Sequence, residues 1–150
     1  LYYGDPTRPE MPRAAGGEHI DVFVITVDDP ETNLRAVRMV RRLYPDATVL
    51  ARARNRQHAW RLMDMSAEPF REVFGTSLEM SGRVLTALGV APDVAERHVQ
   101  RFREHDEQLL RDQYLVYDDE AAVIQTSRDA RNDLMHLFEA DAESDGNKER

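Results

Sequence analysis

The stretch Val22–Arg54, VFVITVDDPETNLRAVRMVRRLYPDATVLARAR, places a helix-like pattern between two apolar segments. Its first segment belongs to Ile20–Val27, a nearly continuous run of β-branched and aromatic residues that is typical of a strand covered on both faces. Its last segment contains Ala47–Ala53, which is predicted to form a second strand. Between them, apolar residues recur every three positions, which predicts an amphipathic helix that ends before Pro45. These residues are Leu34, Val37, Val40 and Leu43.

A second helical pattern, NRQHAWRLMDM, follows the second strand and begins with the capping residue Asn55. The alternation of strand and helix predicts a βαβα unit with a parallel sheet and a right-handed crossover. The sequence therefore predicts an α/β fold.

Two aspartates, Asp28 and Asp29, come directly after the first predicted strand. In parallel sheets of this kind, ligands bind beyond the carboxyl ends of the strands, where helix N-termini also point. Asp29 can be explained as the N-cap of the helix, with Pro30 in its first turn. Asp28 has no such local role, so its carboxylate is the stronger candidate for hydrogen bonds to sugar hydroxyl groups or to an amide.

The opening segment, LYYGDP, has the same form as the end of that strand. An extended aromatic pair is followed by Gly4, which permits close approach of the backbone, and by Asp5 at the end of a strand. The chain has neither an initiator methionine nor the sequence G-x-G-x-x-G of dinucleotide-binding folds. We expect a fragment whose glycine-rich loop lies upstream, and we expect Gly4, Asp5, Asp28 and Asp29 to take part in nucleotide binding.

Composition limits the functions that this chain can carry. Its 150 residues suffice for one domain with an appendage, and they are 41% hydrophobic and 32% charged, as in globular proteins. Cysteine is absent, which excludes disulfides and thiolate sites. The five histidines form no recognisable metal motif, and no serine lies in a nucleophile elbow. We therefore expect neither a catalytic nor a metal site, and, without an apolar run of about 18 residues, no membrane span.

The net charge of −8 is distributed unevenly. Residues 104–150 carry 14 acidic and 5 basic side chains, whereas residues 35–61 carry eight arginines opposed by Asp46 alone. These arginines can attract an anion or form a solvated helix face, and both interpretations stay open. Nucleic acid is a poor fit, because the whole chain is acidic and no aromatic platform is interleaved with the arginines.

Several of these motifs together resemble the nucleotide-binding domain that regulates potassium conductance, known as TrkA-N or KTN. The shared motifs are Gly4-Asp5-Pro6-Thr7, Ala15-Gly16, Asp28-Asp29 with Thr32-Asn33, and Ala51-Arg52-Ala53. The continuation Arg71–Leu110, REVFGTSLEMSGRVLTALGVAPDVAERHVQRFREHDEQLL, is similar to the tail of the Kef glutathione-gated potassium efflux systems. The resemblance covers roughly residues 1–115. Pro6 stands where alanine is usual.

This resemblance implies a fold and a domain organisation. Residues 1–69 would form the second half of a Rossmann-like nucleotide-binding domain, with a partial parallel sheet. Residues 70–140 would form long C-terminal helices for dimerisation and effector binding, and residues 141–150 a flexible acidic tail. The resemblance also implies NAD or AMP as a ligand, which we expect to bind weakly or not at all to a fragment without its glycine loop.

The resemblance further implies an effector site at a dimer interface, formed by an arginine of the motif RE-x-F and an asparagine on the later long helix. Arg71 matches the arginine, whereas Asp106 stands in the place of the asparagine. A carboxylate cannot donate as an amide does, and it repels anionic glutathione, which argues against unaltered recognition of glutathione. Asp106 also interrupts an apolar stripe with helical spacing, where it can be a polar residue at the edge of the stripe.

The sequence thus predicts a regulatory domain without catalytic activity, at the cytoplasmic face of a bacterial inner membrane, that gates potassium/proton antiport. Its expected partners are a second copy, the transport domain of the same polypeptide, glutathione or a glutathione adduct, and an ancillary flavodoxin-like oxidoreductase. Two alternatives stay open. A nicotinamide-dependent oxidoreductase shares the half-sheet but needs a proton donor beside Asp28, and the sequence near that strand end offers none. A soluble gating subunit of a potassium uptake system would carry a small β-rich domain, whereas residues 92–140 show helical patterns.

Overall fold

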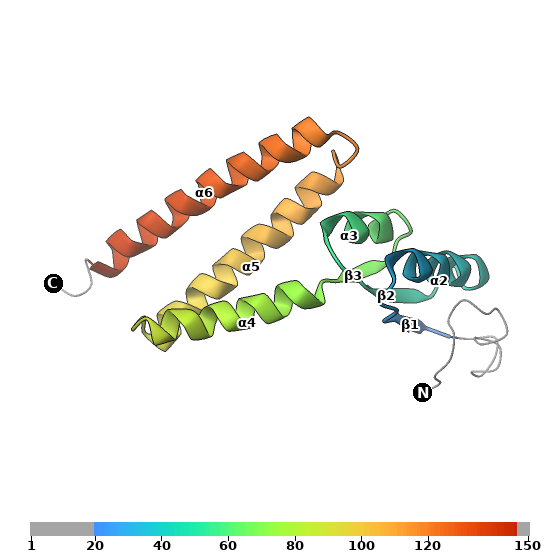
Figure 1. The fold of residues 1–150 in the computed structure, drawn as a ribbon, viewed down its shortest axis with the longest axis horizontal. Coiled ribbons are helices and arrows are strands. Elements are labelled where there is room, and N and C mark those ends of the chain that lie inside the picture. Colours follow the sequence, from blue (N-terminus) through green and yellow to red (C-terminus); the bar gives the residue numbers. More distant parts are fainter. Residues whose placement is uncertain (1–19, 147–150) are drawn as a thin grey trace. The chain divides into compact units, whose positions relative to one another are not determined.

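The computed structural model describes residues 20–146, and the chain divides into two compact units, Leu1–Phe74 and Gly75–Arg150. In the first unit, strands and helices alternate (Figure 1). Their bounds are β1 Val22–Ile25, α2 Pro30–Leu43, β2 Thr48–Arg52, α3 Arg56–Met63 and β3 Glu68–Phe70. Helix α4, Glu72–Ala87, begins in the first unit and continues into the second. The second unit also contains α5, Pro92–Tyr114, and α6, Glu120–Gly146.

The three strands form a parallel sheet in the order β1–β2–β3, which confirms the predicted α/β fold. The register pairs Val24 with Leu50 and Arg52 with Phe70. Strand β3 was not expected, because its sequence, Glu-Pro-Phe, is too short to show a periodic pattern and contains a proline. Proline lacks the N–H group of a sheet ladder and is tolerated at a sheet edge, and β3 is an edge strand of this three-stranded sheet.

One face of the sheet carries the core of the first unit. Ile25, Val49 and Ala51 are buried on this face, which α2 and α3 cover. The buried apolar residues of these helices are Leu34, Ala36, Val37 and Val40 of α2 and Ala59, Trp60 and Leu62 of α3. On the other face, Val24 and Phe70 are each 67% exposed. The expectation that the first strand is covered on both faces is therefore wrong for the residues that the structure describes.

Helices α2 and α3 begin at the predicted caps. Asp29 accepts a hydrogen bond of 2.9 Å from the backbone N–H of Thr32, and Asn55 accepts one of 2.8 Å from the backbone N–H of His58. Helix α2 ends at Leu43, as its apolar pattern predicted. Each cap fixes the residue at which the helix begins after its strand. The short segments between strand and helix therefore lie together at the carboxyl edge of the sheet.

Helices α5 and α6 of the second unit lie antiparallel and are joined by polar and aromatic contacts. Near the turn between them, the buried side chain of Gln113 donates to Val123 O at 3.3 Å and to Ser127 Oγ at 2.8 Å. Towards the other end, His98 stacks on Phe138 with 5.2 Å between the ring centroids. One face of α6 thus contacts α5 through both polar and aromatic side chains.

The expected domain boundaries stay a prediction, and the structure shows two divisions of its own. The compact units divide between Phe74 and Gly75, inside α4, whereas the sequence placed the division before residue 70. The acidic tail was expected from residue 141, whereas α6 continues to Gly146. Within residues 20–146, no helix is long and apolar enough to cross a membrane, and no group of three or more acidic or histidine side chains could hold a metal ion.

A buried asparagine ties the carboxyl ends of β1 and β2 together. Asn33, in the first turn of α2, is fully buried, and its Nδ2 donates to Val27 O at 3.1 Å and to Arg52 O at 3.2 Å. The last residue pair of the ladder between the strands is Ile25 with Ala51. Asn33 therefore links the segment after β1 to the end of β2, where the backbone pairing of the two strands ends. This link helps to hold the two strand ends at a fixed separation.

We predict that Asn33→Leu, which keeps a similar volume without a donor, lowers the free energy of unfolding by about 1–3 kcal/mol, because two partly buried carbonyl groups lose a hydrogen-bond donor. Urea denaturation followed by circular dichroism measures this change. The exposed Asn132 provides a matched control, and Asn132→Leu should change the free energy by less than about 0.5 kcal/mol. Equal effects of the two substitutions would contradict the bridging role of Asn33.

Candidate functional site

A small cleft lies at the carboxyl ends of β1 and β2, beside the start of α4. We call it the strand-end cleft, and its volume is about 290 Å³. It is lined by Val27, Asp28, Arg52, Ala53, Arg54, Glu72 and Val73. Two of these side chains are acidic and two are basic, so the cleft suits a polar ligand better than an apolar one. The structure thus places Asp28 at the edge of the sheet where the sequence predicted a ligand.

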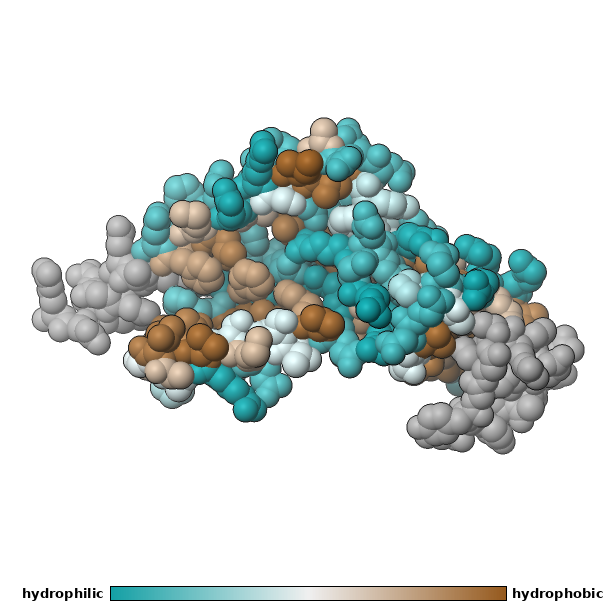
Figure 2. All heavy atoms as spheres, in the orientation of Figure 1, coloured by the Kyte–Doolittle hydropathy of each residue, from teal (hydrophilic) through white to brown (hydrophobic). Residues whose placement is uncertain are grey.

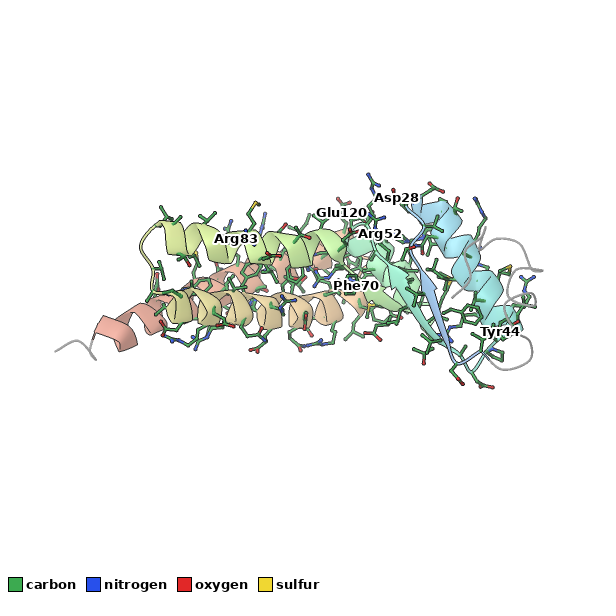
Figure 3. The ribbon with its side chains drawn as sticks, turned by 90° about the horizontal axis from the view of Figure 1, so that it is seen from below. Asp28, Tyr44, Arg52, Phe70, Arg83 and Glu120 are labelled. Atoms are coloured by element: carbon green, nitrogen blue, oxygen red, sulfur yellow. The ribbon has the colours of Figure 1, made fainter. Side chains whose placement is uncertain are left out.

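Arg52 is the central side chain of the strand-end cleft. Its Nη1 lies 2.6 Å from Asp28 Oδ1, and its Nε lies 2.5 Å from Glu72 Oε2. Arg52 and Asp28 are labelled in Figure 3. Arginine remains protonated at physiological pH, so this neighbour of Asp28 cannot serve as an acid or a base. The sequence did not identify Arg52 as a site residue. Its position as the last residue of β2 was the available signal, because parallel strands end at the same edge of a sheet.

None of the other predicted nucleotide-binding residues that the structure describes lines the strand-end cleft with Asp28. Asp29 is engaged by the first turn of α2, and hydrogen bonds from the side chain and the backbone N–H of Thr32 lower the pKa of Asp29. Asp29 does not line the strand-end cleft, so within the described residues it acts as the helix cap. Gly4 and Asp5 lie outside the described residues.

Several arginines of the cluster at residues 35–61 are engaged by the protein itself. Arg41 donates to the carbonyl oxygens of Met65 at 3.0 Å, Ala47 at 2.5 Å and Ser66, which ties the end of α2 to the loops after α2 and α3. On another part of the surface, Arg61 pairs with Glu31 at 2.5 Å. Many of these charges therefore stabilise the fold. Arg52 and Arg54 are the cluster members that line the strand-end cleft.

The two predicted effector residues belong to different compact units. The guanidinium carbon of Arg71, immediately before α4, lies 4.1 Å from the centre of the Phe74 ring, a cation–π contact. Asp106 is buried in α5 and lies on the same stripe as the buried residues Leu110 and Gln113, which follow one and two turns later. The structure therefore places Asp106 within the buried stripe and not at an exposed edge.

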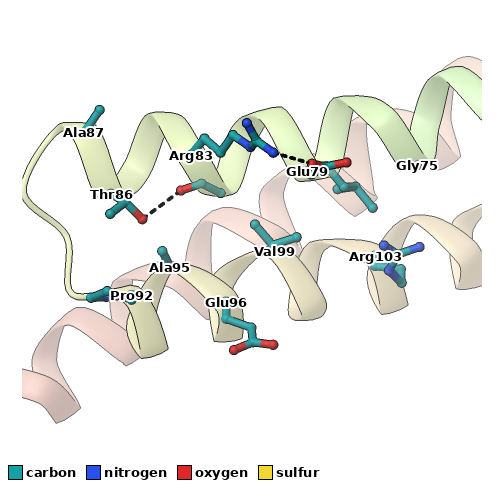
Figure 4. A pocket seen from close by; sticks show the side chains of 12 residues that line it. Gly75, Glu79, Arg83, Thr86, Ala87, Pro92, Ala95, Glu96, Val99 and Arg103 are labelled. Carbon is teal, nitrogen blue, oxygen red and sulfur yellow. Dashed lines mark hydrogen bonds and ion pairs between the residues drawn. The ribbon is translucent and has the colours of Figure 1, made fainter.

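A larger groove lies in the second unit between α4 and α5 (Figure 4). Its volume is about 830 Å³. The two helices come close at Gly82, where an added Cβ atom would make an ordinary van der Waals contact of 3.4 Å with Val99 Cγ2. The predicted effector residues do not line this groove, so it is a separate feature that the sequence did not indicate.

A buried histidine supports the loop that leads to the strand-end cleft. His58 is 4% exposed, and its Nδ1 accepts a hydrogen bond of 3.2 Å from the backbone N–H of Arg54. Because Nδ1 is an acceptor, the proton of the neutral ring is on Nε2, a buried atom for which the structure shows no hydrogen-bond partner. Burial lowers the pKa of His58, the nearby charge of Arg61 acts in the same direction, and Glu31 opposes both.

We predict that the first unit loses stability in acid through His58. The folded-state pKa lies below the unfolded value of about 6.5, so the unfolded chain binds the proton first. The free energy of unfolding should be constant above that pH and fall below it, by at most about 1.4 kcal/mol per pH unit. His58→Asn keeps an acceptor without titrating and should flatten this dependence in urea denaturation, whereas His136→Asn at an exposed position should not. A wild-type-like pH dependence in His58→Asn would reject this role.

Comparison with known proteins covers both units of the chain. Residues 1–70 match the TrkA-N domain, and residues 76–150 match the family described as the potassium efflux system KefB C-terminal domain. A solved structure with a similar fold is the Kef C-terminal domain of Shewanella denitrificans in AMP-bound form. It is 31% identical in sequence, and the match covers 77% of this chain and 73% of that chain with a TM-score of 0.72. The chain therefore belongs to the Kef C-terminal domains, the regulatory domains of potassium efflux systems.

Proposed function

We propose that this chain gates a membrane potassium/proton antiporter from the cytoplasmic face of the inner membrane. The observation that carries the proposal is its similarity to a Kef C-terminal domain solved with AMP bound, together with the charged strand-end cleft. A ligand that binds two arrangements of a domain with different affinities shifts their populations, and the partner that receives this shift is the transport domain of the same polypeptide. Neither the ligand nor the protein undergoes a chemical reaction in this mechanism.

A nucleotide is the ligand that we propose for the strand-end cleft. The carboxylate of Asp28 can accept hydrogen bonds from the hydroxyl groups of a ribose, and Arg54 supplies positive charge for a phosphate. Gly4 and Asp5 would complete the site in the same proposal. Because these 150 residues contain no G-x-G-x-x-G loop to hold the phosphate groups of a nucleotide, we expect weak binding of AMP or NAD.

We predict that Asp28→Asn weakens AMP binding about tenfold to hundredfold, because a hydrogen bond to a charged group contributes about 1.5–3 kcal/mol. Titration followed by NMR chemical shifts detects weak binding and locates it on the chain. Asp21→Asn is the matched control, since Asp21 is exposed and precedes β1 at the opposite end of the strand. Micromolar AMP affinity would contradict weak binding, and equal affinity in both variants would remove Asp28 from the site.

We further propose an effector site that uses Arg71 and Asp106. The guanidinium of Arg71 is oriented by the ring of Phe74 and can donate to an effector carboxylate. Asp106 would oppose the same anion through its own negative charge. A glutathione adduct is the proposed effector, and its affinity is limited by the carboxylate that occupies the position of an amide.

In a titration of a glutathione adduct by calorimetry, Arg71→Ala should reduce the affinity about tenfold to hundredfold, because a charge-assisted hydrogen bond is lost. Asp106→Asn should increase the affinity, because the opposing charge is removed. Arg83→Ala is the control, since Arg83 is an exposed arginine of α4 whose partner is Glu79 on the same helix. Equal affinities of the wild type and the variants of Arg71 and Asp106 would reject the effector site and leave a dimerisation module.

A homodimer is part of the same proposal. Apolar side chains gather over the end of α4 (Figure 2), where Met80 and Val84 of the helix and Leu88, the residue after it, are exposed. A second copy that covers these residues would remove apolar surface from water. An ancillary flavodoxin-like oxidoreductase is proposed as a further partner, on the strength of the resemblance to Kef systems.

A further inference from the structure

The side chain of Arg52 carries one positive charge and is paired with two carboxylates from different elements. One is Asp28, which follows β1, and the other is Glu72, the first residue of α4. Different nitrogen atoms of the guanidinium hold them, Nη1 at 2.6 Å from Asp28 and Nε at 2.5 Å from Glu72. Because two negative charges share one positive charge, the carboxylates compete for it. A change at one carboxylate therefore alters the pairing of the other.

The exposure of these side chains allows the pairs to be exchanged. Arg52 is 35% exposed, Glu72 is 52% exposed and Asp28 is 76% exposed. Ion pairs in contact with water are weak, so hydrogen bonds from a ligand can replace one of them. Asp28 is the more exposed carboxylate, and it is therefore the one that a ligand in the strand-end cleft reaches more readily.

Glu72 connects this group of charges to the second unit. Helix α4 begins at Glu72 in the first unit and continues past Phe74 into the second. The pair between Arg52 and Glu72 joins the start of this helix to the end of β2. The strength of that pair therefore controls how firmly the first turn of α4 is held to the sheet.

We propose that Arg52 couples ligand occupancy at Asp28 to the anchoring of α4. The identity of the ligand rests on the function proposed above. When hydroxyl groups of a ligand engage Asp28, Arg52 loses a competing partner and pairs more fully with Glu72, so the first turn of α4 is held more firmly. Coupling between two sites is reciprocal, so Glu72 in turn favours ligand binding by drawing Arg52 away from Asp28.

Hydrogen exchange of the purified chain tests this coupling without a ligand. In an α-helix, the amides of Thr76–Leu78 bond to carbonyl groups of the first turn of α4, so their exchange reports the opening of that turn. Asp28→Asn removes the competing charge and should slow their exchange about twofold to fivefold, the range expected for an exposed ion pair. The same substitution should have no effect when it is combined with Arg52→Gln or with Glu72→Gln.

A matched control uses another ion pair of the first unit. Glu31 pairs with Arg61 at 2.5 Å, and both side chains are about half exposed. Glu31→Gln removes an acidic charge from the surface as Asp28→Asn does, but it does not affect Arg52. The amides of Thr76–Leu78 should therefore exchange at the wild-type rate in Glu31→Gln.

The same measurement with AMP tests the link to the ligand. Saturating AMP should slow exchange at Thr76–Leu78 in the wild type and leave it unchanged in Glu72→Gln. Calorimetry should show about twofold to fivefold weaker AMP binding in Glu72→Gln, by reciprocity.

Adenosine, which carries the hydroxyl groups without the phosphate, should slow exchange at Thr76–Leu78 as AMP does. Faster exchange with AMP would show that the phosphate takes Arg52 from Glu72, and it would overturn the proposed direction.

The outcomes separate this coupling from the proposed nucleotide site. Unchanged exchange in Asp28→Asn overturns the coupling, whatever AMP does. Slower exchange in Asp28→Asn, with no AMP binding anywhere on the chain, supports the coupling and rejects the nucleotide. AMP binding that leaves exchange at Thr76–Leu78 unchanged keeps the nucleotide site and overturns its coupling to α4.

Discussion

Parallel pairing of β1 and β2 is the constraint on which the candidate site depends. Parallel strands end at the same edge of a sheet, so Asp28 and Arg52 meet although α2 separates them in the chain. Asn33 maintains this arrangement beyond the last ladder pair by donating to a carbonyl group of each chain segment. In an antiparallel pair the two strand ends would lie at opposite edges, and no such cleft would form.

The arginines show how an acidic protein accommodates a basic segment. Arg41 is engaged by carbonyl oxygens, and Arg61 by Glu31, so their charges contribute to local structure. Arg52 and Arg54 remain beside the strand-end cleft, where Asp28 and Glu72 balance them. A cleft with both signs of charge favours a ligand that combines hydroxyl and anionic groups, and a nucleotide has this combination.

Helix α4 spans the boundary between the two compact units. Its first residues, Glu72 and Val73, line the strand-end cleft, and its later residues belong to the second unit. Buried polar side chains accompany this arrangement in both units: His58 supports the loop before α3, and Gln113 joins α5 to α6. Such groups need specific partners, and they therefore restrict the packing to fewer arrangements than apolar contacts alone would.

The sequence by itself determined the features that depend on residues close together in the chain. The caps Asp29 and Asn55 follow from local hydrogen bonding. The apolar face of α2 follows from a period of 3.6 residues, and the alternation of strands with helices, which requires a parallel sheet, follows from where such patterns begin and end. The position of Asp28 at the strand ends followed from the same pattern. Tertiary structure alone decided that Arg52 pairs with both Asp28 and Glu72, and that one face of β1 is exposed within the described residues. The physical reason is that pairing and burial depend on which distant segments pack together, and this information is absent from any local periodicity.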